Sequence, residues 1–288
     1  MSAYDIEEVV FRTGSLAVPL SILRLDKPDR VAGGNKSFKL RHNIDAFREG
    51  GYEAILSFGG PYSNHIAALA AIGRQSGIPV IGLIREGGGS ESGSVTLRRA
   101  AAQGMRLQVI SRSEYRRYRD SDDYSELVER FGRVWVIPEG GCNAEGIKGC
   151  SEIAHYIPCD FDQVAIAVGT GATFCGLRSA LSRQTSLLGV KVVEARQERF
   201  IERRLGKAVS EENGMVLNGD FTFGGYARPS KILDEFVERW QDQTGIPAEP
   251  VYTGRLFHAL VSLFLMGYFK KGSRILAIHS GGMQYLAD

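Results

Sequence analysis

Two short motifs in this chain carry side chains whose chemistry goes beyond packing. Gly33-Gly34-Asn35-Lys36 places a lysine directly after a glycine turn, and Ser63-Asn64-His65 groups a hydroxyl, an amide and an imidazole. A lysine amine acts as a nucleophile when it loses its proton near neutral pH, which burial or a neighbouring positive charge promotes. Each motif also has an ordinary interpretation, with Lys36 as a surface charge and Ser63 as a helix N-cap.

A third motif, Val168-Gly169-Thr170-Gly171-Ala172-Thr173, joins a predicted strand to a predicted helix. The two glycines let several backbone N–H groups point at one anion, and the helix N-terminus and the threonine hydroxyls favour the same ligand. The competing interpretation is a dinucleotide fingerprint with Glu194 as its acidic residue, in a nicotinamide-dependent oxidoreductase. Phe174 stands where that fingerprint needs its third glycine, so one phosphate group fits better than a pyrophosphate.

Two further glycine-rich corners follow predicted strands. They are Glu139-Gly140-Gly141-Cys142-Asn143 and His279-Ser280-Gly281-Gly282. The carboxyl ends of parallel strands gather at one side of a sheet, where ligands bind in open α/β folds. We therefore expect all of these motifs to converge on one site. An amine, a nucleophilic hydroxyl and an anion cradle together are what a pyridoxal phosphate site requires.

Short apolar runs alternate with longer amphipathic ones, and this pattern predicts the elements that position the motifs. The strand candidates are rich in Ile, Val and Leu, as in strands buried on both faces, and comprise 21–25, 54–58, 80–84, 106–110, 134–137, 163–167, 188–193 and 274–278. The helix candidates comprise 39–49, 64–76, 92–103, 145–156, 173–183, 230–244 and 255–269. Repeated strand–helix units indicate an α/β fold with open, twisted, mostly parallel sheets flanked by helices.

Crossings of the chain near residue 45 and near residue 140 predict two units. The larger, cofactor-binding unit comprises 1–45 plus 140–288, and the smaller α/β unit, 46–139, is inserted in it. No long Pro/Ser linker separates them.

The composition is ordinary, with 288 residues, 43% hydrophobic and 24% charged. A net charge of +2, from 35 Lys plus Arg against 33 Asp plus Glu, argues against nucleic acid as a partner, and the basic segment 112–119 is interpreted as a solvated helix face. No segment reaches the roughly 20 apolar residues of a membrane span, and residues 1–8 carry no hydrophobic signal core, so we expect a cytoplasmic protein without membrane contact. The 4 cysteines form no CxxC pair, and we expect reduced thiols and no metal site.

On these motifs the chain resembles the fold type II, tryptophan-synthase-β-like enzymes that depend on pyridoxal 5'-phosphate. More narrowly, it is similar to the family of 1-aminocyclopropane-1-carboxylate deaminase and D-cysteine desulfhydrase, from Gly33 to Gly282. The resemblance implies a two-domain fold, pyridoxal 5'-phosphate as the cofactor, a small amino acid as the substrate and a homodimer. The reaction classes that it implies are lyase, deaminase and hydrolase.

The resemblance also implies roles for individual residues. Two active-site tyrosines correspond to Tyr226 in Phe223-Gly224-Gly225-Tyr226 and to Tyr252 in Pro250-Val251-Tyr252-Thr253-Gly254. The implied catalytic residues are Lys36 as the cofactor lysine, Ser63, Tyr226 and Tyr252. The implied substrate contacts are Ser63, Asn64, His65, Tyr226 and Tyr252. The implied cofactor contacts are Lys36, Asn64 at the ring hydroxyl, Gly169, Thr170, Gly171, Ala172 and Thr173 at the phosphate, and Ser280 near the pyridine nitrogen.

One departure from the family pattern bears on the reaction. Thr253 stands where the cyclopropane-opening deaminases carry a glutamate directly after the second tyrosine. A hydroxyl from Ser280 or Thr253 would not keep the ring nitrogen protonated as a carboxylate does, and a shallower electron sink suits β-elimination. The leading hypothesis is therefore D-cysteine desulfhydration to a 2-oxo acid, ammonia and sulfide. The alternatives are 1-aminocyclopropane-1-carboxylate deamination, elimination or replacement on a specialised amino acid, and a catalytically silent binding module.

Overall fold

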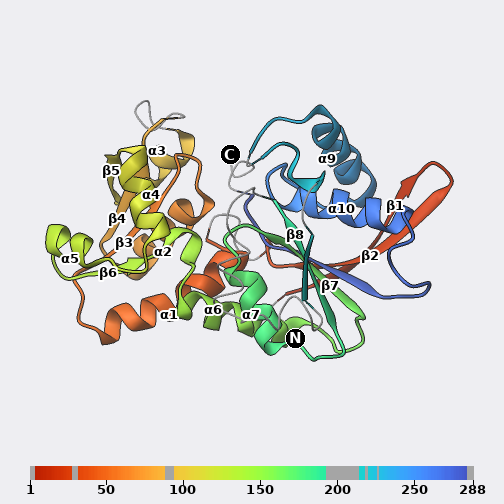
Figure 1. The fold of residues 1–288 in the computed structure, drawn as a ribbon, viewed down its shortest axis with the longest axis horizontal. Coiled ribbons are helices and arrows are strands. Elements are labelled where there is room, and N and C mark those ends of the chain that lie inside the picture. The colour runs from red at the N-terminus through yellow and green to blue at the C-terminus, as the bar shows by residue number, and fades with distance from the viewer. Residues whose placement is uncertain are drawn as a thin grey trace.

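The computed structural model describes residues 4–27, 32–87, 94–192, 214–217, 220–225 and 227–283. In these ranges the chain forms two sheets, each packed against helices on both faces (Figure 1). Every pairing of neighbouring strands but one is parallel. The predicted α/β architecture with mostly parallel sheets is therefore confirmed.

The larger sheet has the strand order β1-β2-β10-β7-β8-β9. Its strands are β1 (Ile6–Thr13), β2 (Leu16–Arg24), β10 (Ile275–His279), β7 (Gln163–Val168), β8 (Ser186–Lys191) and β9 (Gly214–Leu217). β1 and β2 form an antiparallel hairpin in which Ile6 pairs with Leu23. The sequence analysis missed β1, because this edge strand exposes one face and carries polar residues such as Glu8 and Arg12 within its apolar run.

The smaller sheet has the order β5-β4-β3-β6. Its strands are β5 (Arg106–Ile110), β4 (Val80–Arg85), β3 (Ala54–Gly59) and β6 (Val134–Ile137), of which β5 and β6 have the predicted bounds. Every residue of β3 is buried, which explains its continuous apolar run.

The helices connect the strands and cover the sheets. They are α1 (Asn35–Glu49), α2 (Asn64–Ser76), α3 (Val95–Ala102), α4 (Arg112–Asp120), α5 (Ser125–Phe131), α6 (Ala144–Ser151), α7 (Ala172–Ala180), α9 (Lys231–Thr244) and α10 (Thr253–Leu265), with 3-10 turns η1 (Glu139–Gly141), η2 (Glu152–Tyr156) and η4 (Asp220–Thr222). The bounds of α2 are those predicted, because the Ser63 hydroxyl caps its start and Gly77 ends it with a φ of 66°. The predicted helix 255–269 ends earlier, at Leu265. Gly267, two residues further on, has a φ of 70°, which does not continue a right-handed helix.

Helix α1 joins the two sheets. Its Phe38 packs in a core of the larger sheet with α6 and α7, whereas Leu40 packs in a core of the smaller sheet with α2 and α3. Helices α9 and α10 cover the other face of the larger sheet, where Trp240 stacks on Phe257 at 4.2 Å. The start of α1 is thereby fixed between the two sheets. The proposed division into 1–45 plus 140–288 and 46–139 stays a prediction.

In the described part of the chain, no helix combines the length and the apolar character needed to cross a membrane.

Candidate active site

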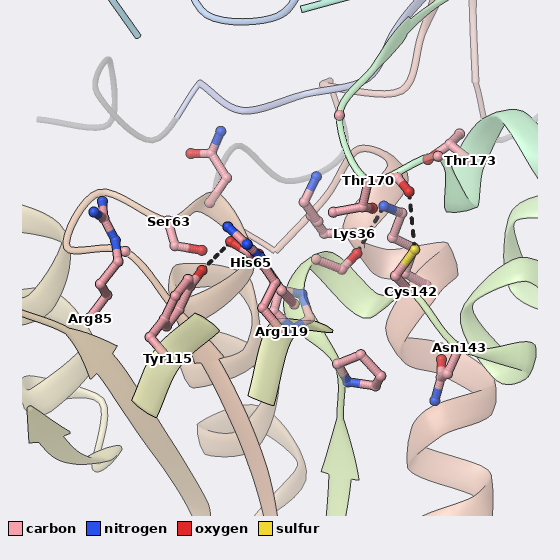
Figure 2. Close-up of a pocket in the computed structure, with 18 of the residues that line it drawn as sticks. Lys36, Ser63, His65, Arg85, Tyr115, Arg119, Cys142, Asn143, Thr170 and Thr173 are labelled. Atoms are coloured by element: carbon pink, nitrogen blue, oxygen red, sulfur yellow. Dashed lines mark hydrogen bonds between the residues drawn. The ribbon is translucent and has the colours of Figure 1, made fainter. Parts of the chain in front are cut away.

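One cavity receives residues from all of the motifs singled out in the sequence. It lies between the two sheets and is lined by 35–36, 63–65, 139–140, 142–143, 169–171, 173, 252 and 280–282, among others (Figure 2). Among the predicted site residues, Ala172 is buried as the first residue of α7 and does not line the cavity. Tyr226 lies outside the described residues. The predicted convergence of the motifs is what the structure shows.

Lys36 lies in the first turn of α1, as its glycine turn predicts. Gly34 has a φ of 66°, and a β-carbon there would lie only 2.3 Å from the carbonyl oxygen of Ser280, so only glycine lets the two segments approach. The Asn35 N–H donates to that same carbonyl oxygen at 3.1 Å, and the Lys36 Nζ donates to Asn35 Oδ1 at 2.7 Å. Burial, followed by the nearby charge of Lys39, lowers the pKa of the Lys36 amine to about 7. Much of the amine is therefore neutral near physiological pH.

The loop between β7 and α7 forms an anion cradle next to this amine. Gly171 has a φ of 94° and stands directly before α7, so the loop curls around the helix N-terminus. The Asn35 Nδ2 donates to the Thr173 Oγ1 at 2.9 Å, and this hydrogen bond ties the cradle to the lysine turn. The buried hydroxyl of Thr170 has no hydrogen-bond partner among the described residues. A buried hydroxyl without a partner is unfavourable, which suits a site completed by an anion.

His65 is a neutral hydrogen-bonding group and not a general acid. The Ser57 hydroxyl donates its one proton to the Ile137 carbonyl oxygen at 2.8 Å, so it must accept from His65 Nε2 at 3.0 Å. The His65 Nδ1 is then a buried acceptor, with no partner among the described residues. Burial, together with the charges of Lys36 and Lys39, lowers the pKa of His65 to about 3.

Two side chains complete the fit of the expected cofactor. The buried Asn64 Oδ1 lacks a partner in the described ranges, and a β-carbon on Gly282 would lie 2.9 Å from Asn64 Nδ2. Asn64 thus reaches the last strand corner, where Ser280 also borders the cavity. An aromatic aldehyde with a ring hydroxyl and a phosphate would pair Asn64 Oδ1 and the Thr170 hydroxyl while its aldehyde faces Lys36. The residues present therefore fit pyridoxal 5'-phosphate.

Tyr252 packs over the anion cradle. A β-carbon on Gly169 would lie 3.1 Å from the Tyr252 Cε1, so the glycine makes room for the ring. The backbone N–H groups of Val251, Tyr252 and Thr253 all donate to the carboxyl of Glu249, at 2.7 to 2.8 Å. Glu249 thereby fixes the segment that presents Tyr252 to the cavity.

Thr253 does not supply a hydroxyl to the cofactor. It is fully buried, its Oγ1 donates to Glu249 Oε1 at 3.2 Å, and it does not line the cavity. Ser280, in contrast, lines the cavity, and its role near the pyridine nitrogen stays a prediction.

Several residues of the site escaped the sequence analysis. Lys39 lies one helical turn after Lys36, and its Nζ donates to the Gly140 carbonyl oxygen at 2.9 Å; the i, i+3 spacing was the available signal. Glu249 and Arg85 carried no motif. The basic segment 112–119 is helical, as predicted, but three of its arginines also line the cavity, so its interpretation as a purely solvated face was incomplete.

Replacing Thr170 by valine should weaken binding of pyridoxal 5'-phosphate. Valine keeps the shape but removes the buried hydroxyl, and a hydrogen bond to a charged group corresponds to roughly a 10- to 100-fold change in affinity. Titration of the apoprotein with the cofactor, followed by absorbance, measures this. Thr13→Val in the β1–β2 hairpin is the matched control, and equal affinities of the two variants would contradict the assignment.

Glu249 should make stability depend on pH. Burial raises the pKa of its carboxyl from 4.5 to about 7 despite the backbone hydrogen bonds that lower it. The folded state therefore binds the proton more tightly than the unfolded state, so the free energy of unfolding falls as pH rises through this window, by about 3 kcal/mol. Urea denaturation of wild type and Glu249→Gln at pH 5 and pH 8 measures this contribution as the difference between the two pH slopes, because the lowered pKa values of His65 and Lys36 act with the opposite sign in both proteins. The same slope in both proteins would contradict it.

Comparison with known proteins agrees with the geometry of the site. Residues 30–281 match the family described as "Pyridoxal-phosphate dependent enzyme". A D-cysteine desulfhydrase of Klebsiella pneumoniae (strain 342) is 28% identical over 287 residues, which cover 91% of this chain and 86% of the relative. A 1-aminocyclopropane-1-carboxylate deaminase of Ralstonia pickettii (strain 12J) is 26% identical over 285 residues, covering 88% and 83%. A solved structure described as an ACC deaminase homologue superimposes with a TM-score of 0.77 at 26% identity, covering 92% of this chain and 85% of that one.

These findings confirm the expected fold type II architecture and the expected cofactor. They correct one expectation. The class hydrolase is wrong, because the family match and the relatives, which are deaminases and a desulfhydrase, indicate lyase chemistry.

Proposed function

Because the chain belongs to the pyridoxal-phosphate-dependent enzyme family and is a lyase, we propose that it catalyses β-elimination on a small amino acid, most like D-cysteine desulfhydrase. The products would be a 2-oxo acid, ammonia and the leaving group, sulfide in the case of cysteine. The observation that carries the proposal is the Lys36 amine, with its pKa lowered to about 7, in one cavity with the 169–173 cradle.

Different residues of the chain have different roles in the proposed reaction. Bound pyridoxal 5'-phosphate supplies an electron sink for the pair that remains when the bond from Cα to hydrogen breaks. Lys36, neutral in part near pH 7, takes the proton from Cα. Ser63 and the N-terminus of α2 bind the substrate carboxylate, with Asn64 and His65 as its neighbours. Tyr252, and Tyr226 in the other predicted tyrosine segment, serve as acid or base or position a hydroxyl.

Ring opening of 1-aminocyclopropane-1-carboxylate is the second candidate. It is favoured by the names of the Ralstonia pickettii relative and of the ACC deaminase homologue. In that reaction Ser63 would add to a ring carbon. Against it stands the absence of a carboxylate at position 253, where the buried Thr253 turns toward Glu249.

The cellular compartment and the oligomeric state of the enzyme are also proposed. All four cysteines, which lie in the described ranges, are free thiols, as expected in the reducing cytoplasm. A homodimer follows from the family resemblance, and size-exclusion chromatography with light scattering tests it.

A product assay tests the proposed function. Cofactor-loaded protein is mixed with D-cysteine, L-cysteine, D-serine and 1-aminocyclopropane-1-carboxylate, and 2-oxo acid and sulfide are measured. We expect 2-oxo acid and sulfide in equal amounts from a cysteine enantiomer. Production of 2-oxo acid from the cyclopropane substrate alone would establish the second candidate instead.

A further inference from the structure

The active-site cavity is lined by an arginine, Arg85, that the proposed reaction does not use. Arg85 is the last residue of β4, so it stands at the carboxyl end of a strand and lines the same cavity as Lys36 and Ser63 (Figure 2). We propose that, among the small amino acids this elimination accepts, the enzyme prefers one whose β-substituent is itself an oxyanion, such as a phosphate ester, and that Arg85 binds this group. The inference rests on the proposed function, because it specifies the substrate of the same elimination.

The guanidinium of Arg85 has unused hydrogen-bond donors. Arg85 is half-buried, and its side chain forms neither an ion pair nor a hydrogen bond with the described residues. Its guanidinium lies over the ring of Tyr115, 5.8 Å from the centroid. Contact with an aromatic face leaves the N–H groups of a guanidinium available, and their planar fork matches two oxygens of a phosphate. A partly desolvated cation with free donors is a site for an anion.

Arg85 also lies close to the proposed position of the substrate. Its Nη2 is 3.7 Å from the place that a β-carbon on Gly60 would take, and the Ser63 N–H donates to the Gly60 carbonyl oxygen at 3.1 Å. One short turn therefore connects Arg85 with the N-terminus of α2, where the α-carboxylate would bind. A compact amino acid with two anionic groups could contact both places at once.

Neighbouring arginines extend the positive charge along this wall. Arg112, Arg116 and Arg119 follow one another along α4 and line the cavity, and Arg119 is paired with Asp120 at 2.9 Å. Asp120 and Asp122 also line the cavity and offset part of this charge, and the remaining excess of arginines attracts an anionic substrate over a neutral one.

The nearby carboxyl of Glu139 does not use Arg85. The Glu139 carboxyl accepts a hydrogen bond from the Tyr115 hydroxyl. Glu139 and Arg85 are both described by the structure, and they form no ion pair with each other. Burial raises the pKa of the Glu139 carboxyl, whereas its hydrogen bond with Tyr115 and the charges of Arg119 and Arg85 act in the opposite direction.

The proposed step balances for O-phosphoserine. The Cα–H bond breaks and its proton goes to Lys36, while its electron pair becomes the second bond between Cα and Cβ. The Cβ–O bond breaks, and inorganic phosphate leaves with the bonding pair, its growing charge stabilised by Arg85. The released 2-aminoacrylate takes up water to give pyruvate and ammonia.

The test compares a substrate with an anionic β-substituent and one with a neutral β-substituent. The ratio of kcat/KM for O-phosphoserine to that for β-chloroalanine, each as both enantiomers, is measured for wild type, Arg85→Met and Arg48→Met. Arg48 is exposed on α1 and outside the cavity, so Arg48→Met is the control for loss of one charge. We expect wild type and the control to prefer O-phosphoserine. The ratio of kcat/KM for O-phosphoserine to that for β-chloroalanine should be roughly 10- to 100-fold lower in Arg85→Met than in wild type.

The outcomes separate this inference from the proposed function. Turnover of β-chloroalanine with an unchanged ratio in Arg85→Met overturns the inference and leaves the proposed function standing. If neither compound is turned over, calorimetry with 2-amino-3-phosphonopropionate decides the role of Arg85, and the proposed function fails only if the cysteine enantiomers also give no 2-oxo acid. Equal dissociation constants for wild type and Arg85→Met would then overturn the inference as well, whereas a roughly 10-fold weaker binding by Arg85→Met would support it.

Discussion

Replacement of Lys36 by alanine should remove the visible absorbance of the cofactor-loaded protein and lower turnover by roughly 10³-fold or more. The Lys36 amine lies at the cavity wall with the 169–173 cradle, and its lowered pKa keeps part of it neutral. Its loss removes both the group that holds the aldehyde and the base at Cα. Absorbance spectra and the 2-oxo acid assay measure the two effects independently.

A matched control and a rescue sharpen this test. Lys148→Ala changes an exposed lysine on α6 and should leave spectrum and turnover unchanged. Added methylamine should restore part of the turnover of Lys36→Ala, since it supplies the missing base. A Lys36→Ala protein that retains the visible band and its turnover would show that another group serves as the cofactor lysine.

Arg255→Met should destabilise the fold by about 4 kcal/mol or more. Arg255 is fully buried, and its guanidinium donates to the carbonyl oxygens of Pro250, Val192, Thr222 and Gly225, at 3.1, 2.6, 2.7 and 2.9 Å. Methionine fills much of the space but leaves these buried acceptors without their donor. Each such acceptor costs about 1 to 3 kcal/mol. Urea denaturation at fixed cofactor concentration measures the loss.

Arg255 also holds the site together. It joins the segment of Pro250, which leads to Tyr252, to the turn of Thr222 and Gly225, which leads to Tyr226. We therefore expect Arg255→Met to lower kcat even at urea concentrations below its unfolding midpoint, where the protein is folded. Arg255→Lys should have an intermediate kcat, because an ammonium reaches fewer carbonyl oxygens than a guanidinium. A loss of stability no larger than that of Arg48→Met would contradict this role.

Local patterns in the sequence determined much of the architecture. The bounds of α2, β5 and β6 follow from capping residues and apolar runs that act within a few residues. The motifs at strand ends predicted one site, because parallel strands bring their carboxyl ends to one side. Placing Lys36 at a helix start and Thr170 in an anion cradle needed only the glycines beside them.

Only the tertiary structure decided which other residues belong to the site. Arg85 is an ordinary strand residue in sequence, and its half-buried guanidinium, which has no charged partner in the part of the chain that the structure describes, appears only when β4 is placed beside the turn of Gly60. Glu249 and Arg255 are distant in sequence from Lys36, and their roles depend on backbone groups that the fold turns toward them. Capping and periodicity act over short range, whereas burial, pKa shifts and free charges depend on which segments the fold brings together.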